Sequence, residues 1–184
     1  MRKIVFQNMI TLDGYFEGPN HELDWHHVDS EWNEYAEEFL NTVDTLLFGR
    51  VTYELMAKYW PTENAIKDDP IIANKMNSLK KIAFSRTLDK VDWNNSSLIK
   101  ENVPEEVFKL KQTEGKSMAM FGSSNLALTF IENNLIDEYR IMVNPLILGA
   151  GHTLLNGIKQ KLDLGLIKTK TFKSGLVGLY YQPK

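Results

Sequence analysis

The sequence contains no cysteine among its 184 residues. Disulfides, thiolate zinc sites and cysteine nucleophiles are therefore excluded. No segment approaches the roughly 20 apolar residues of a membrane span, and the chain runs from Met-Arg-Lys into a strand-like segment without a signal peptide. The net charge of −3 provides no basic excess for binding nucleic acid. We therefore expect a cytoplasmic protein that binds neither nucleic acid nor membranes.

Hydrophobic residues make up 43% of the chain and aromatic residues 11%, which is enough for a packed core and excludes intrinsic disorder. No internal repeat or low-complexity tract divides the sequence. The most linker-like stretch, Pro61 to Pro70, is short and has apolar segments on both sides. Since a domain has about 100–200 residues, we expect residues 1–184 to form a single domain.

Apolar runs of strand length, bounded by turn residues, predict an α/β fold. Helical spacing separates several of them, which is typical of a largely parallel sheet, whereas strand-like segments alone follow Asp137 and predict antiparallel strands at one edge. The sheet is therefore expected to be mixed. The predicted strands are Ile4–Ile10, Thr45–Phe48, Ile82–Phe84, Ser117–Phe121, Tyr139–Val143 and Leu176–Tyr181.

Capping residues and the spacing of apolar residues predict helices in several of the intervening segments. Small polar side chains are expected to cap the helix starts, at Asp29 or Ser30 in one case and at Ser123 or Ser124 in another. The helix after the second predicted strand has one apolar face, made by Val51, Leu55, Met56 and Tyr59.

Three predicted strands run into a small or polar turn that opens a helix or a polar segment. Ligands bind at the carboxyl ends of such strands, where glycine allows close approach and helix N–H groups attract anions. Arg50 and Arg86 add planar donors suited to phosphate. Together the turns predict a nucleotide cradle, and the alternative is that they are ordinary turn and cap residues. The turns are Gly49-Arg50-Val51-Thr52, Ser85-Arg86-Thr87 and Gly122-Ser123-Ser124-Asn125.

The loop after the first strand contains two glycines, a proline and two aromatic residues within Thr11–Pro19. Such a composition indicates a shaped loop that can act as a lid. Asp24 and Trp25 follow, and a carboxylate beside an aromatic ring can bind and stack a heterocycle. The alternative interpretation is a capping aspartate and a packed tryptophan.

Other site types have weaker support. His21, His26, His27 and Asp24 lie close in sequence, but no His-Glu-x-x-His motif occurs and adjacent histidines project differently, so we expect no metal site. Gly149-Ala150-Gly151 lacks the third glycine of a dinucleotide fingerprint, and no Gly-x-Ser-x-Gly elbow or Walker loop is present.

The order of the motifs resembles the dihydrofolate-reductase-like family, in particular stand-alone bacterial relatives of the reductase (C-terminal) domain of the bifunctional riboflavin-biosynthesis deaminase-reductase. The resemblance spans nearly the whole chain, and the order and spacing of the motifs make it specific. The matching segments are Thr11-Leu12-Asp13-Gly14-Tyr15, Gly18-Pro19-Asn20, Leu23-Asp24-Trp25, Leu47-Phe48-Gly49-Arg50-Val51-Thr52-Tyr53-Glu54, Phe84-Ser85-Arg86-Thr87-Leu88, Gly122-Ser123-Ser124, Leu135-Ile136-Asp137-Glu138 and Asn144-Pro145-Leu146-Ile147-Leu148-Gly149-Ala150-Gly151.

The resemblance implies a dihydrofolate reductase fold, NADPH as cofactor and a homodimer. It places Gly49, Arg50 and Thr52 near the pyrophosphate and the 2′-phosphate, and Ser85 and Arg86 at the adenosine phosphate. The remaining implied contacts are Gly122, Ser123, Ser124 and Asn125 at the pyrophosphate, and Met9, Ile10 and Thr11 at the nicotinamide. The chain departs from the family at Phe121, where a glycine is usual, and at Met120, where the riboflavin reductases carry an acidic residue.

We therefore expect an NADPH-dependent reductase of a pterin-like or aminopyrimidine-like small molecule. Asp13 is the expected catalytic or substrate-orienting group, and Asp24 with Trp25 the expected substrate side. Two alternatives stay open: a nucleotide-binding protein of the same fold without turnover, and a riboflavin-pathway reductase proper, against which Met120 argues.

Overall fold

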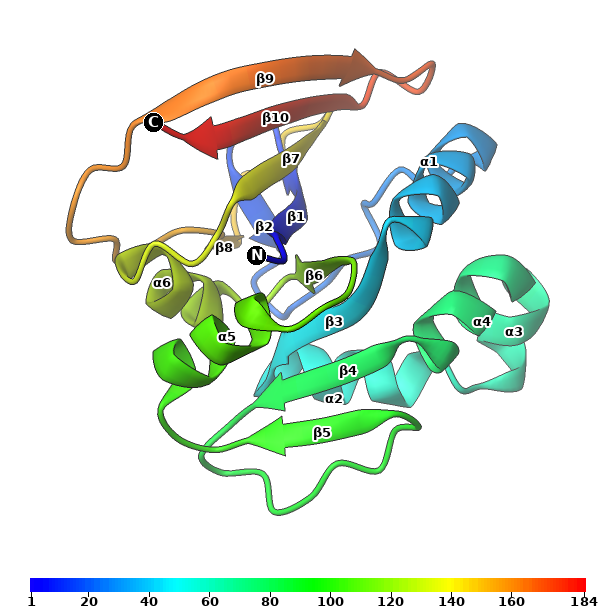
Figure 1. Ribbon diagram of the computed structural model, residues 1–184. Coiled ribbons are helices and arrows are strands. Elements are labelled where there is room, and N and C mark those ends of the chain that lie inside the picture. The colour runs from blue at the N-terminus through cyan, green and yellow to red at the C-terminus, as the bar shows by residue number, and fades with distance from the viewer.

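The computed structural model describes residues 1–184 as one eight-stranded sheet with helices on both faces and a separate two-stranded ribbon (Figure 1). The strand order in the large sheet is β5-β4-β3-β6-β1-β7-β10-β9. Its strands are β1 (Ile4–Thr11), β3 (Val43–Gly49), β4 (Lys80–Phe84), β5 (Ser96–Ile99), β6 (Ser117–Phe121), β7 (Glu138–Asn144), β9 (Leu164–Thr171) and β10 (Val177–Pro183). The ribbon pairs β2 (Tyr15–Glu17) with β8 (His152–Thr153).

The sheet is mixed and mostly parallel, as the sequence predicts. Strands β5, β4, β3, β6, β1 and β7 are parallel to one another. Strand β10 runs antiparallel to β7 and to β9, which confirms the antiparallel edge expected after Asp137. All six predicted strands are present, with ends that differ by at most two residues. The edge strands β5 and β9 and the short ribbon were not among the predicted strands.

Six helices connect the strands, and Figure 1 shows α5 and α6 on one side of the sheet and α1 to α4 on the other. The short helix α3 occupies most of the stretch from Pro61 to Pro70. The helices are α1 (Ser30–Asn41), α2 (Arg50–Tyr59), α3 (Glu63–Asp68), α4 (Pro70–Ser78), α5 (Val103–Gln112) and α6 (Ser124–Glu132).

Alternation of side chains along the parallel strands produces two cores, one on each face of the sheet. Met118 and Met120 of β6 pack with α5 and α6, whereas Ala119 between them packs with α1, α2 and α4. Ile4 and Phe6 of β1 face the α5–α6 side in the same way. The central strands are buried on both faces, so their near-continuous apolar sequences were recognisable as strands.

Helix α2 does not bury the aliphatic face that its sequence pattern indicates. Of the predicted face, Val51, Leu55 and Tyr59 lie outward, with 58%, 47% and 48% of these residues exposed, whereas Met56 is half-buried and packs against the core. The buried residue of α2 is Tyr53, whose hydroxyl accepts a hydrogen bond from the backbone N–H of Trp93 at 3.0 Å. The helix is anchored by an aromatic side chain with a polar end, which the spacing of aliphatic residues does not indicate.

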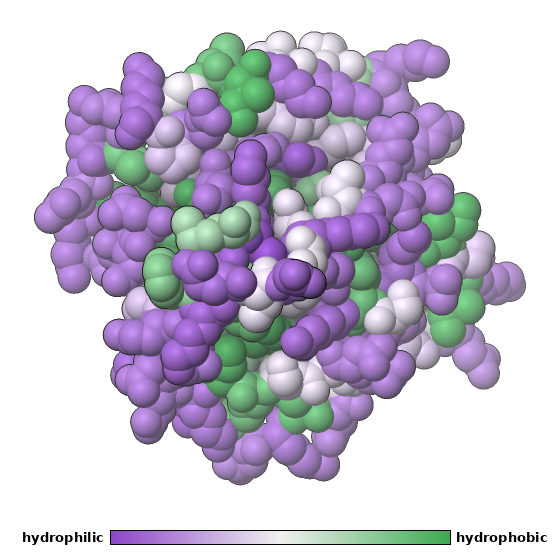
Figure 2. All heavy atoms as spheres, viewed as in Figure 1, coloured by the Kyte–Doolittle hydropathy of each residue, from purple (hydrophilic) through white to green (hydrophobic).

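The outer surface carries mostly hydrophilic residues in the view of Figure 2, and hydrophobic residues appear there in separate groups. None of the helices combines the length and the apolar character needed to cross a lipid bilayer.

Helix α1 begins at the predicted N-cap Asp29, whose carboxylate accepts the backbone N–H of Trp32 at 2.8 Å. Replacing Asp29 with alanine leaves this N–H without its partner, so we expect the free energy of unfolding to fall by about 1 kcal/mol. For a chain of this size that corresponds to a decrease of about 2–4 °C in the melting temperature. Differential scanning calorimetry measures the change. The control Asp24→Ala removes an exposed carboxylate from the same loop, and equal losses for both variants would contradict the capping role.

Candidate functional site

The strand order brings four carboxyl ends together, because β4, β3, β6 and β1 are consecutive and parallel in the sheet. The segments that follow β3, β4 and β6 line one cleft with a volume of about 1050 Å³. This volume is just above the usual range for small-molecule sites. Eight of the twelve predicted cofactor residues line it: Gly49, Arg50, Thr52, Ser85, Arg86, Ser123, Ser124 and Asn125.

Direct hydrogen bonds hold the turns of the cleft together. The backbone N–H of Gly49 donates to the Oγ of Ser123 at 2.7 Å, which joins the turn after β3 to the turn after β6. The backbone N–H of Gly122 donates to the Oδ1 of Asn8 on β1, also at 2.7 Å. Three neighbouring strands are therefore linked at their carboxyl ends by contacts that involve turn residues rather than the sheet itself.

The hydroxyl groups of Ser85 and Ser123 shape the turns. Ser85 Oγ accepts the backbone N–H groups of Thr87 at 3.1 Å and Leu88 at 3.0 Å. Ser123 does not cap α6 with its side chain, because its Oγ accepts from Gly49 instead. This corrects the expectation that Ser123 is a side-chain cap. Both hydroxyl oxygens already accept hydrogen bonds within the protein. We therefore assign these two residues a structural role in the wall of the cleft.

The helix starts at the cleft differ from those elsewhere in the protein. Helices α1, α3 and α4 begin away from the cleft, and each has a side-chain cap, from Asp29, Thr62 and Asp69. Helices α2, α5 and α6 begin at the cleft and have no side-chain cap. Acidic residues occupy the first turn of α5 but are absent from the first turns of α2 and α6. The free N–H groups of α2 and α6 can therefore receive an anion.

Two arginines line the same cleft. The guanidinium of Arg50 pairs with Glu54 at 2.9 Å, and both side chains are about half exposed. An exposed pair of this kind on one helix contributes only about 0.3–0.5 kcal/mol, so a phosphate can displace Glu54 at little cost. Arg86 is exposed and takes part in none of the ion pairs of the protein. Both guanidinium groups are thus available to a phosphate in the cleft.

The predicted nicotinamide contacts on β1 do not line this cleft. Met9 packs with the cluster formed by α1 and β10, whereas Ile10 packs on the α5–α6 side, so the two side chains face opposite sides of the sheet. Thr11 is fully buried, and its hydroxyl donates to Asp13 Oδ1 at 2.6 Å. Gly122 does not line the cleft either; its N–H is bonded to Asn8, and a Cβ added to it would meet the side chain of Thr52. Their contact with a cofactor stays a prediction.

Asp13 joins two loops of the protein. Its Oδ1 accepts from Thr11 and from the backbone N–H of Leu148 at 3.1 Å, and its Oδ2 accepts from the backbone N–H of Gly149 at 2.8 Å. Hydrogen bonds from the Thr11 hydroxyl and from these backbone groups lower the pKa of Asp13 to about 2. The carboxylate is outside the cleft and charged at neutral pH. This geometry supports a positioning role, and the catalytic role remains a prediction.

The two predicted substrate residues also lie outside the cleft. Asp24 is exposed, and the indole Nε1–H of Trp25 donates to the carbonyl of Glu22 at 3.2 Å. The ring of Trp25 meets His26 edge-on, with 4.5 Å between ring centroids. Burial lowers the pKa of His26 to about 4, and its Nε2 is buried without a hydrogen-bond partner. The substrate assignment of Asp24 and Trp25 stays a prediction.

The sequence-based assignment missed residues that the fold brings to the cleft. Glu17, His21 and His152 form part of its wall, although His152 lies more than 100 residues after the other two. Asn8 was also missed, and its Nδ2 is buried without a partner while its Oδ1 holds Gly122. For Asn8 a signal exists in the sequence, since it and its neighbour Gln7 are carboxamides within a mostly apolar central strand.

Comparison with known proteins identifies one family across the chain. The family model of the RibD C-terminal domain matches residues 2–178. The uncharacterized protein YyaP of Bacillus subtilis is 37% identical over 180 residues, which cover 98% of this chain and 94% of YyaP.

Solved structures with lower identity share the fold. A putative riboflavin biosynthesis protein from Shewanella sp. PV-4 superimposes with a TM-score of 0.75 and 23% identity, covering 100% of this chain and 99% of its own. Dihydrofolate reductase from Enterococcus faecalis, solved in complex with NADP(H) and RAB-propyl, gives a TM-score of 0.66 at 13% identity. The coverage is 99% of this chain and 96% of the reductase. The α/β fold described above is therefore dihydrofolate reductase-like.

The hydrogen bonds of Asp13 generate a pH-dependent prediction. Because its pKa in the folded state lies near 2 and its ordinary value is 3.8, its stabilisation is complete above about pH 5 and lost as the pH falls toward 2. The difference in melting temperature between the wild type and Asp13→Asn should therefore shrink between about pH 5 and pH 2. Thermal unfolding followed by circular dichroism measures it. The exposed Asp24→Asn serves as control, and a constant difference for Asp13→Asn would contradict the structural role.

Proposed function

Because the chain belongs to the RibD C-terminal domain family, we propose that it is an NADPH-dependent reductase acting on a pterin-like or aminopyrimidine-like heterocycle. The observation that carries this proposal is the pair of uncapped helix starts, α2 and α6, that open on one cleft beside Arg50 and Arg86. Helix N–H groups and guanidinium groups together are a phosphate-binding combination.

The residues of the cleft fit a dinucleotide. The first turns of α2 and α6 offer backbone N–H groups to the pyrophosphate, and Ser124 and Asn125 add side-chain donors at the start of α6. Arg50 and Arg86 carry the positive charge that the 2′-phosphate requires. The Asn8 carboxamide holds Gly122 in place, so the turn after β6 keeps its shape for a ligand.

When bound, NADPH supplies the hydride that reduces a carbon–nitrogen double bond. The contribution of this chain is to bind and orient the two reactants. The loop after β1 is fixed for this purpose by Asp13, which ties it to the loop after β7. Asp13 is ionised at neutral pH and is thus a poor proton donor. We therefore propose that the proton comes from water rather than from Asp13.

A second candidate function is binding of NADPH, or of another phosphate ligand, without turnover. The observation that favours it is the position of the expected chemical groups. Asp13 is occupied by three hydrogen bonds, and Asp24 and Trp25 do not line the cleft. The cradle for phosphate would be retained in this case, since its residues are the ones that the cleft brings together.

A substrate panel separates the two functions. We expect steady oxidation of NADPH, followed by its absorbance, with at least one member of a set of dihydropterins and ribosylaminopyrimidines. In parallel, NADPH should raise the melting temperature, because a ligand at 100 times its Kd stabilises the folded state by about 2.7 kcal/mol. A thermal shift without turnover on any panel member would favour the binding protein. No shift at millimolar NADPH would contradict the reductase and would leave only the binding of another phosphate ligand.

The arginine pair predicts the choice of cofactor. Charge-assisted contacts contribute roughly 1.5–3 kcal/mol each, and solvent screening reduces this at exposed sites. The double variant Arg50→Ala/Arg86→Ala should therefore bind NADPH about 10- to 1000-fold more weakly. NADH lacks the 2′-phosphate, so its Kd should change much less.

Isothermal titration calorimetry with both cofactors measures these constants. The matched control is Lys58→Ala/Lys90→Ala, which removes the same charge from a separate hollow lined by Tyr53 and Trp93. Equal losses for NADPH and NADH in the arginine variant would assign the arginines to the shared pyrophosphate or to the fold.

A further inference from the structure

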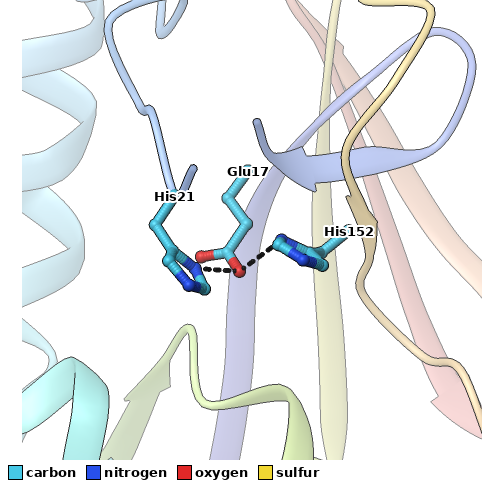
Figure 3. A group of neighbouring side chains, drawn as sticks. All are labelled: Glu17, His21 and His152. Atoms are coloured by element: carbon cyan, nitrogen blue, oxygen red, sulfur yellow. Dashed lines mark hydrogen bonds and ion pairs between the residues drawn. The ribbon is translucent and has the colours of Figure 1, made fainter. Parts of the chain in front are cut away.

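Three potential metal ligands converge on the wall of the cleft. The Oε1 atom of Glu17 lies 2.7 Å from the Nδ1 of His21 and 3.0 Å from the Nδ1 of His152. Figure 3 shows the two imidazole rings on either side of the Glu17 carboxylate, with both Nδ1 atoms directed at the same oxygen. The rings are nearly parallel, at 20°, with 5.0 Å between their centroids. The three ligand atoms lie within 4.8 Å of one another.

The backbone around these residues places them together. Glu17 and His152 are directly paired across the ribbon formed by β2 and β8. His21 returns over Glu17 through a turn closed by the hydrogen bond from its N–H to the carbonyl of Gly18, at 3.0 Å. The position before His152 is Gly151, where a Cβ would collide with the carbonyl oxygen of Glu17. Glycine at this position therefore permits the close approach of β8 that brings His152 to the carboxylate.

Hydrogen bonding to the two histidines leaves much of the acceptor capacity of the Glu17 carboxylate unused. A carboxylate has two oxygens with about four acceptor positions. Here both imidazoles approach Oε1, while Oε2 of Glu17 takes part in no hydrogen bond within the protein. Two nitrogens and one oxygen within 4.8 Å of one another are close enough to bind a single cation after small rotations of the side chains.

We propose that Glu17, His21 and His152 form a binding site for a divalent transition-metal ion, with Zn²⁺ as the preferred ion. Two imidazoles and a carboxylate are ligands that suit zinc, whereas Mg²⁺ and Ca²⁺ prefer an all-oxygen set. Bonds of 2.0–2.1 Å in a tetrahedron separate ligand atoms by about 3.3 Å. The 2.7 Å and 3.0 Å separations from Glu17 must therefore open by about 0.6 Å and 0.3 Å, and the two imidazole nitrogens must also come to about 3.3 Å from each other.

The histidines are free to make this adjustment. The side chains of His21 and His152 are 64% and 47% exposed, whereas that of Glu17 is only 17% exposed. Glu17 thus supplies a fixed, largely buried ligand, and the two imidazoles can rotate around it. Three protein ligands leave a fourth position of the tetrahedron open. Because all three residues line the cleft, this position faces the space where the phosphate cradle lies.

This proposal departs from the expectation that the chain has no metal site. That expectation considered His21 with its sequence neighbours His26, His27 and Asp24. In the structure His21 points instead to Glu17 and to a residue of a distant strand. The metal site is independent of the reductase proposal, since its ligands can bind an ion whether or not the cleft binds NADPH.

The first experiment measures binding of the ion itself. The full chain, freed of metal by a chelator, is titrated with ZnCl₂ in a calorimeter. We expect one Zn²⁺ per chain with a Kd of roughly 0.1–10 μM, weaker than four-ligand structural sites. MgCl₂ should give no binding in this range. Titration with CoCl₂ should produce the visible absorption bands of tetrahedral Co²⁺, which report the geometry. The absence of Zn²⁺ binding at 100 μM would overturn the proposal.

The second experiment assigns the ligands. His21→Ala and His152→Ala should each weaken Zn²⁺ at least about tenfold, and Glu17→Gln, which keeps the size of the side chain, should do the same. The matched control is His27→Ala, which removes an exposed imidazole from the same loop and should leave the Kd unchanged. Melting temperatures without metal establish that each variant is folded. Unchanged Zn²⁺ binding in His21→Ala/His152→Ala, or an equal loss in His27→Ala, would refute the site.

Discussion

The insertion of β6 between β1 and β3 is the constraint on which the rest of the structure depends. It aligns the carboxyl ends of three parallel strands, and the pairs Gly49–Ser123 and Gly122–Asn8 then join the turns that follow them. Helices α2 and α6 start directly after these turns, on opposite faces of the sheet. Because the strand register fixes where both helices begin, the two sets of free N–H groups meet at one cleft.

The central part of this fold was predictable because its strands are buried on both faces. Ser117–Phe121 was predicted with both ends correct, since every residue between them is apolar and fully buried. The edge strand β9 was missed for the opposite reason: most of its residues are exposed, and its sequence alternates lysine and threonine near its end. A strand that contacts the sheet along one edge carries little of the apolar signal from which strands are recognised.

The candidate site, like the fold, was predictable only in part. The turns after β3, β4 and β6 were predictable because each follows a recognisable strand, and the parallel order then places them together. The direction of a side chain was not predictable from the same information. Ser123 Oγ turns back to Gly49, and Thr11 binds Asp13, because each backbone conformation leaves an N–H or a carboxylate within reach. Contacts such as Glu17 with His152 depend on two loops that meet only in the folded chain.

The central position of β1 has a consequence for synthesis of the protein. β1 is synthesised before both of its neighbours, because Ile4 pairs with Met118 and Val5 with Glu138, more than 100 residues later. At about 5–20 residues per second, this apolar strand waits roughly 5–25 s for its neighbours. During that interval its backbone groups and its apolar side chains are open to other nascent chains. The segment therefore stays without its sheet partners until both β6 and β7 have been made.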